Sequence, residues 1–213
     1  MHIPDGILGP AVTLAGYAGT AAVMAVCLGQ IAKRDDPRRD VPKAAMLTAA
    51  FFVASLVHVP IPPTSVHLML NGLLGVVLGW FAFPAIVVGL FFQAVMFGHG
   101  GLTTLGVNAL VLGLPSLLAF ALFSARHRLL PAAPWSDAAV GFVAGAGAVA
   151  AAVVLVAVVV LAGLPAHVDP DLERRAIQVF ALAHVPLMVI EGVVVAMVLA
   201  FLRKASPELL LGR

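Results

Sequence analysis

The chain has 213 residues, of which 62% are hydrophobic and 10% are charged, and its formal net charge is +2. A soluble domain carries roughly 25% charged residues, so this composition excludes a soluble protein and indicates a multi-pass membrane protein. The single cysteine, Cys27, lies inside an apolar run, which excludes a disulfide framework and a cysteine metal site. No basic region precedes the first apolar run, so we expect no cleavable signal peptide.

Seven apolar runs predict seven transmembrane helices. In chain order they lie near Leu8–Ala32, Ala44–Val57, Ser65–Trp80, Ala82–Phe97, Thr104–Ala125, Ala138–Leu164 and Ala176–Leu202. The second to fourth runs are short against the ~20 residues of a full crossing, so they tilt little or end at a cavity. Prolines and the glycine-rich segment 98–101 mark the joints.

The basic residues predict the orientation of these helices. With the N-terminus outside, ten of the 12 Lys and Arg residues fall in cytoplasmic segments, and only Arg174 and Arg175 fall in outer loops. This asymmetry follows the positive-inside rule. We therefore predict an all-α bundle of seven transmembrane helices, with the N-terminus outside and the C-terminus cytoplasmic, in a single integral membrane domain over residues 1–213.

The same topology gathers histidines at the outer side of the membrane. Only His127 is cytoplasmic, and the outer half holds His2, His58, His67, His99, His167 and His184. Imidazole is a ligand for nickel, copper, cobalt and zinc. The distribution therefore favours a metal site in the outer half.

The first two residues form a potential chelate. The Met1 amine, the His2 backbone nitrogen and a His2 ring nitrogen are three donors close to one plane, which suits Ni(II) or Cu(II). The alternative is that the dipeptide has no function. Asp5 follows closely, and it either orients the His2 ring or the amine, or it caps the first helix.

Two further polar groups lie at predicted helix ends. The spacing of His67 and Asn71 predicts that both lie on one helix face and point inward, whereas His67 alone could lie at the headgroup boundary. Gln93, the 98–101 loop with His99, and Asn108 form a dense polar stretch. Its glycines would let it cover a buried N-terminus, or it is an ordinary outer turn with polar caps.

Glu191 is the only carboxylate inside a predicted span, and His184 precedes it by seven residues, or two helical turns. The two side chains can therefore share a helix face. An intramembrane carboxylate is costly and indicates function. Glu191 either orients a ligand histidine or pairs with an amide inside the bundle.

Together these motifs resemble those of the NikM/CbiM family, the substrate-binding membrane subunits of energy-coupling factor transporters for nickel and cobalt. The resemblance covers the chain from end to end. It rests on Met1-His2-Ile3-Pro4-Asp5-Gly6, Thr64-Ser65-Val66-His67 with Leu70-Asn71-Gly72, Gly100-Gly101-Leu102-Thr103-Thr104-Leu105-Gly106-Val107-Asn108, and His184-Val185-Pro186-Leu187 with Glu191-Gly192.

The resemblance implies that residues 1–6 insert into the outer half of the bundle. There the Met1 amine, the His2 amide and imidazole, and a later histidine, matched by His67, would hold one Ni(II) or Co(II) ion in a flat four-nitrogen site. Flat nitrogen coordination favours nickel. Supporting residues around the ion are expected among Asp5, Ser65, Asn71, His99, Asn108, His184 and Glu191.

The resemblance also implies the partners. The chain would import its metal with a transmembrane coupling subunit, a pair of cytoplasmic ATPases and often a small accessory membrane protein, in a bacterial or archaeal cell membrane. A cobalt substrate would link it to cobalamin biosynthesis. We expect no prosthetic group, no nucleic-acid partner and no ATP hydrolysis by this chain, which has no Walker motif.

Two other classes of membrane protein are compared with this pattern of residues. An intramembrane metalloprotease would need an HExxH motif, which is absent, and Glu191 has no histidine at the matching positions. A proton-coupled secondary metal carrier, with Glu191 as the proton relay, is the alternative function.

Overall fold

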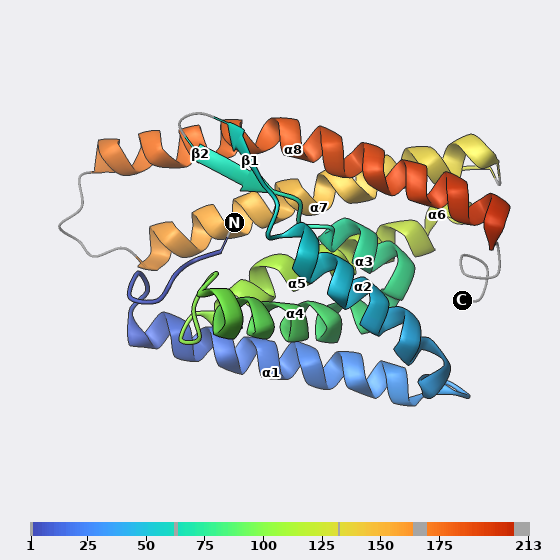
Figure 1. Ribbon diagram of the computed structural model, residues 1–213, viewed down its shortest axis with the longest axis horizontal. Coiled ribbons are helices and arrows are strands. Elements are labelled where there is room, and N and C mark those ends of the chain that lie inside the picture. Colours follow the sequence, from blue (N-terminus) through green and yellow to red (C-terminus); the bar gives the residue numbers. More distant parts are fainter. Residues whose placement is uncertain (1, 62–63, 132, 164–169, 207–213) are drawn as a thin grey trace.

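The computed structural model describes residues 2–61, 64–131, 133–163 and 170–206. Within these ranges the chain folds into helices and one short hairpin (Figure 1). The elements are α1 (Pro10–Ala32), η1 (Pro37–Asp40), α2 (Val41–Ala54), β1 (His58–Ile61), β2 (Thr64–His67), α3 (Asn71–Leu78), η2 (Gly79–Phe81), α4 (Ala82–Phe97), α5 (Leu105–Ser124), α6 (Arg126–Leu129), α7 (Pro134–Gly163) and α8 (Pro170–Ala205).

Five helical stretches in the described ranges are long and apolar enough to cross a membrane. They are Pro10–Ala32, Asn71–Phe97, Leu105–Ser124, Trp135–Gly163 and Arg175–Ala205. The prediction of a helical membrane protein is therefore confirmed. Helix α2 has only 14 residues, shorter than a full crossing.

The predicted span Ser65–Trp80 is wrong over its first residues. Residues 64–67 form β2, which pairs antiparallel with β1, and His58 lies opposite His67 in the ladder. Helix α3 begins only at Asn71, after Leu70 adopts a left-handed backbone conformation with φ of 48°. The proline-rich connection between the strands, residues 62–63, lies outside the described residues. Local apolar composition did not distinguish this hairpin from a helix.

Helices α3 and α4 form a helical hairpin. At Gly79 the backbone takes φ 61° and ψ −123°, a conformation that ends α3 and that glycine adopts readily. His67 precedes α3 and His99 follows α4, yet their ring centroids are only 5.2 Å apart. The chain therefore runs away from these histidines along α3 and returns along α4, so both connections lie at the same end of the bundle.

Helix α5 lies at the centre of the bundle, against α1, α3, α4 and α7 (Figure 1). Close approach is possible because small residues lie at the crossings: a Cβ on Gly75 of α3 would lie 1.9 Å from the Ser116 carbonyl oxygen of α5. Helices α7 and α8 pack along each other over most of their lengths. Helix α1 lies at the periphery, where it leaves most of its surface to the membrane.

Candidate metal centre

The segment that precedes α1 docks against α5 through Ile3. The Ile3 N–H donates to Asn108 Oδ1 at 2.9 Å, and Asn108 Nδ2 donates to the Ile3 carbonyl at 3.0 Å. The Thr104 hydroxyl donates to the same carbonyl at 2.7 Å. Since Ile3 is also buried, both of its backbone polar groups need these partners. One amide side chain therefore binds the segment much as a neighbouring β-strand would.

Asp5 holds the next part of this segment. Its carboxylate accepts hydrogen bonds from the Leu102 N–H at 3.2 Å and from the Thr103 N–H and hydroxyl at 2.9 and 2.5 Å. These hydrogen bonds, that of the Thr103 hydroxyl first, lower the pKa of Asp5. The N-cap of α1 is Gly9, so the prediction that Asp5 caps the first helix is wrong. Asp5 instead caps the turn that leads into α5.

The glycine-rich loop after α4 lies over the docked segment. Gly98 takes a left-handed conformation with φ of 61° and its N–H bonds to the Ala94 carbonyl, which ends α4 in a left-handed glycine cap, and the His99 N–H bonds back to the Gln93 carbonyl. A Cβ on Gly101 would lie 2.0 Å from Asp5 Oδ1, and one on Gly100 would lie 3.4 Å from His2 Cβ. The absence of side chains at these glycines is what lets the loop cover the N-terminal segment, in line with the covering role weighed for it from the sequence.

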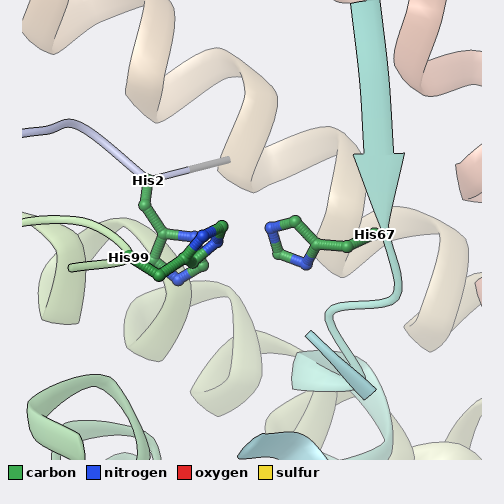
Figure 2. Close-up of side chains that lie close together, drawn as sticks. All are labelled: His2, His67 and His99. Carbon is green, nitrogen blue, oxygen red and sulfur yellow. The ribbon is translucent and has the colours of Figure 1, made fainter. Parts of the chain in front are cut away.

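Three histidines from distant parts of the chain converge under this loop. Each of His2, His67 and His99 offers a ring nitrogen that lies within 4.8 Å of the other two. Figure 2 shows the His2 and His99 rings side by side and the His67 ring facing them from the end of β2. The centroid of the His2 ring lies 5.1 Å from that of the His67 ring and 4.4 Å from that of the His99 ring. The spacing suits three donors around one metal ion.

The His67 ring is oriented by its own backbone. Nδ1 lies 3.1 Å from the Leu68 carbonyl oxygen, which can only accept, so Nδ1 carries the proton. The lone pair is therefore on Nε2 and available to an ion. A carbonyl acceptor on the second ring nitrogen is a common feature of histidine metal ligands.

The His2 ring is buried without hydrogen bonds. Neither Nδ1 nor Nε2 makes a hydrogen bond of normal geometry with any part of the chain that the structure describes. Loss of water lowers the pKa of His2 well below its usual value of 6.5, and the neighbouring His67 and His99 imidazoles lower it further. The ring is therefore neutral at neutral pH, the form that binds a metal.

Glu191 contacts the backbone segment that directly follows His67. Its carboxyl oxygens accept from the Met69 N–H at 2.5 Å and from the Leu70 N–H at 2.9 and 3.2 Å. Glu191 is fully buried in α8. It thus anchors the left-handed turn between β2 and α3, and with it the position of His67.

The remaining predicted residues lie apart from the three rings. His184 is buried in α8, but its Nδ1 bonds to the Phe180 carbonyl at 2.7 Å in the same helix. The prediction that His67 and Asn71 share a helix face is wrong, because His67 ends β2 and Asn71 begins α3. Asn71 is buried and accepts from the Gly72 N–H.

Some of the predictions fall outside what the structure describes. Met1, with its amine, and His167 lie outside the described residues, as do the side chains of Ser65 and His58. Sequence reasoning also missed the roles of Thr104 and Ser55, and it noted Gln93 only as part of a polar stretch. The available signal was a polar side chain within or beside an apolar helix, which is seldom left facing lipid.

Comparison with known proteins agrees with this geometry. The sequence profile of the family described as "Cobalt uptake substrate-specific transmembrane region" (CbiM) matches residues 2–209. A crystal structure of a transition metal transporter superimposes with a TM-score of 0.82 at 26% identity, covering 98% of this chain and 95% of that one.

Relatives that align with nearly all of this chain are also named for metal transport. A protein of Haemophilus influenzae ascribed to metal transport is 34% identical, over 99% of this chain and 97% of its own length. The "Cobalt transport protein CbiM" of Sorangium cellulosum is 30% identical, over 99% and 94%. The "Fused nickel transport protein NikMN" of Rhodobacter capsulatus is 32% identical over 100% of this chain, which spans only 65% of that longer protein.

Proposed function

Because this chain belongs to the CbiM family of transmembrane proteins for cobalt and nickel uptake, we propose that it is the substrate-binding subunit of an energy-coupling factor importer. It captures Ni(II) or Co(II) from outside the cell and delivers the ion to the cytoplasm. The observation that carries the proposal is the convergence of the His2, His67 and His99 rings, in which the buried His2 nitrogens make no hydrogen bond of normal geometry with the part of the chain that the structure describes.

The proposed ligands come from two places in the chain. His2 supplies a ring nitrogen and its backbone nitrogen, His67 supplies Nε2, and the Met1 amine completes a flat set of four nitrogens. His99 lies beside this set. Such a set suits Ni(II), and imidazole also serves Co(II). The docking of Ile3 and Asp5 on the start of α5 supports the proposal, because it holds His2 against the other two rings.

The proposed cycle opens and closes at the glycine-rich loop. An incoming ion loses its water shell and displaces protons from the amine and the His2 amide, and the 98–101 loop then covers the filled site. Burial of the ordered segment stabilises the bound state. Release requires the segment to leave α5, which a tilt of the whole subunit or a distortion of the loop would cause.

Partners would drive that release. We propose a transmembrane coupling subunit and two cytoplasmic ATPases, often with a small accessory membrane protein, and a seven-span topology with the N-terminus outside in a bacterial or archaeal cell membrane. The relative named as a fused nickel transport protein supports a multi-component system, since more than a third of its length lies beyond the match to this chain.

An N-terminal extension tests the chelate. Placing one alanine before Met1 turns the amine into an amide and moves the free terminus, so we expect nickel and cobalt affinity of the purified protein to fall by at least about 100-fold, or two tenfold steps of 1.4 kcal/mol. The control is the same alanine added at the C-terminus. Unchanged affinity in the N-terminally extended protein, measured by competition with a chelating dye, would rule out the terminal chelate.

The proton-coupled carrier is the second candidate, because Glu191 is a fully buried carboxyl group in α8. Its hydrogen bonds to Met69 and Leu70 favour the anchoring role instead. Liposomes that contain this chain alone discriminate the two. Nickel uptake driven by a pH gradient without ATPases would support the carrier and contradict the importer subunit.

A further inference from the structure

Gln93 lies in the last two turns of α4 and is fully buried. Its Nε2 donates to the Ser55 hydroxyl oxygen at 2.6 Å, and the Ser55 hydroxyl donates to the Phe52 carbonyl at 2.7 Å. Ser55 has a single hydroxyl proton, which the carbonyl takes, so toward Gln93 it can only accept. The orientation of the Gln93 amide is therefore determined: its nitrogen faces Ser55 and its oxygen faces away.

The Gln93 oxygen has no donor. Oε1 is buried, and no residue in the described ranges gives it a hydrogen bond. An unsatisfied buried acceptor destabilises the folded protein, so its presence calls for an explanation. The Gln93 backbone carbonyl accepts from the His99 N–H, and the His99 and His2 ring centroids lie 4.4 Å apart, so Gln93 borders the three histidines. Burial lowers the pKa of His2 most, and the Gln93 side chain raises it as a hydrogen-bond partner of the ring, in agreement with that position. The buried Gln93 oxygen and the His2 ring nitrogens, none of which has a hydrogen bond of normal geometry in the described ranges, therefore lie at the same site.

We propose that Gln93 is the positioning residue for His2: when one ring nitrogen of His2 binds the ion, the other donates its N–H to Gln93 Oε1. The inference rests on the proposed metal-binding function and names the residue that orients its N-terminal ligand. Coordination through one ring nitrogen fixes the proton on the other, and that N–H is the donor that the Gln93 oxygen needs.

The second histidine already has the equivalent partner. His67 Nδ1 bonds to the Leu68 carbonyl, which leaves Nε2 for the ion. Asn108, the other buried amide near His2, is not available, because its oxygen accepts from the Ile3 N–H and its nitrogen donates to the Ile3 carbonyl. Gln93 therefore gives His2 what the backbone gives His67: one acceptor that selects which nitrogen is protonated and how the ring is turned.

Two substitutions at Gln93 test whether metal affinity depends on the acceptor oxygen or only on the shape of the side chain. Gln93→Met keeps the length but removes the acceptor, and we expect nickel and cobalt affinity to fall about 10–100-fold, the range for lost partners of histidine ligands. Gln93→Glu keeps an acceptor and should retain affinity within about threefold of the wild type. Thr48→Val is the matched control, since the one partner of the Thr48 hydroxyl within the described ranges is the Ala44 carbonyl of the same helix, α2. Ser55→Ala removes the partner of the Gln93 amide nitrogen but keeps the amide itself. Its nickel and cobalt affinity should therefore lie between those of the wild type and Gln93→Met.

A spectroscopic measurement reports on the hydrogen bond itself. In protein loaded with paramagnetic Co(II), the imidazole N–H of His2 should give a shifted proton resonance that exchanges slowly with water. We expect the resonance to be lost by rapid exchange in Gln93→Met and retained in Gln93→Glu. A purely structural role for Gln93 would leave this exchange unchanged, and so would overturn the inference. If Gln93→Met does not fold, Gln93→Glu and Ser55→Ala carry the same test.

The inference and the proposed function fail in different ways. Wild-type protein that binds neither nickel nor cobalt contradicts the function, whatever the variants do. Wild-type protein that binds these ions, with Gln93→Met binding equally well and a slowly exchanging His2 N–H in both, contradicts only the role of Gln93.

Discussion

Two buried polar clusters lie near opposite ends of α7, and they differ in how well their polar atoms are paired. The first, the histidine end, comprises His2, His67, His99 and Gln93. The second, the ion-pair end, comprises Arg126, Asp137 and Arg203. Helix α7 connects them: Asp137 lies in its first turn, and Gly163, its last residue, packs against Leu8 of the N-terminal segment (Figure 1).

At the ion-pair end the charged groups are matched. Arg126 Nε donates to Asp137 Oδ1 at 2.9 Å, and Arg203 Nη1 donates to Asp137 Oδ2 at 2.5 Å. Arg126 also donates to the Phe123 carbonyl at 2.9 Å. One carboxylate thus joins α6, α7 and α8, with each of its oxygens bonded. Such a cluster holds helices together, and its buried carboxylate has no oxygen left without a partner.

At the histidine end, in contrast, buried polar atoms remain unmatched. The two His2 ring nitrogens and Gln93 Oε1 have no hydrogen bond of normal geometry within the described ranges. A folded protein rarely tolerates such groups without a reason, and a missing ligand is one. Incomplete pairing, rather than polarity or burial, is therefore what distinguishes the proposed metal site from the structural cluster in this bundle.

The largest expected effect is at the ion-pair end. Asp137→Ala leaves the buried Arg126 unpaired and should lower the free energy of unfolding by about 3–5 kcal/mol. Nickel affinity should stay within about twofold, because distant sites are close to additive. Unfolding in detergent and dye competition measure the two quantities. Asp36→Ala, at an exposed carboxylate, is the control. A large loss of nickel affinity in folded Asp137→Ala would contradict the separation of the two ends.

The next effect concerns the docking of the N-terminal segment. Asn108→Ala removes both hydrogen bonds to the Ile3 backbone: the Ile3 carbonyl keeps the Thr104 hydroxyl, but the buried Ile3 N–H loses its acceptor, which costs about 1–3 kcal/mol. We expect nickel affinity to fall about 100-fold, at 1.4 kcal/mol per factor of ten. Ser116→Ala is the matched control on α5, since among the described residues the Ser116 hydroxyl bonds only to the Gly113 carbonyl in the same helix. Equal affinity in the two variants would mean that docking does not position His2.

The smallest of the three effects concerns the helix that reaches both ends. Helix α8 contributes Arg203 to the ion-pair end and Glu191 to the turn after His67. Glu191→Ala leaves the buried Met69 and Leu70 N–H groups without their acceptor, so we expect about a tenfold loss of nickel affinity. Glu191→Gln should restore most of it, because a single amide oxygen can accept both bonds. Dye competition measures this affinity. A Glu191→Gln protein that binds nickel like the wild type but does not transport it would favour the proton-relay role instead.

Much of the molecule could be predicted from the sequence. Apolar runs longer than the bilayer core identified the positions of α1, α5, α7 and α8, because a helix satisfies its own backbone in lipid. The motifs that begin at His2 and at Thr64 predicted the family and two of the three clustered histidines. The role of His99 stayed open, because a histidine between glycines is equally compatible with an ordinary turn.

What the sequence by itself determined is therefore the class of protein, its membrane helices and the residues worth testing, since composition, periodicity and motifs are local properties of the chain. Only the tertiary structure decided the partners. Asn108 binds Ile3, Asp5 caps the turn before α5, Glu191 anchors the turn after His67, and the Gln93 amide nitrogen donates to Ser55. The first three contacts join residues about 100 positions apart, and no local pattern encodes them. The contacts of Asn108 and Glu191 form because a buried backbone group needs a hydrogen-bond partner, and packing brings that partner from elsewhere in the chain.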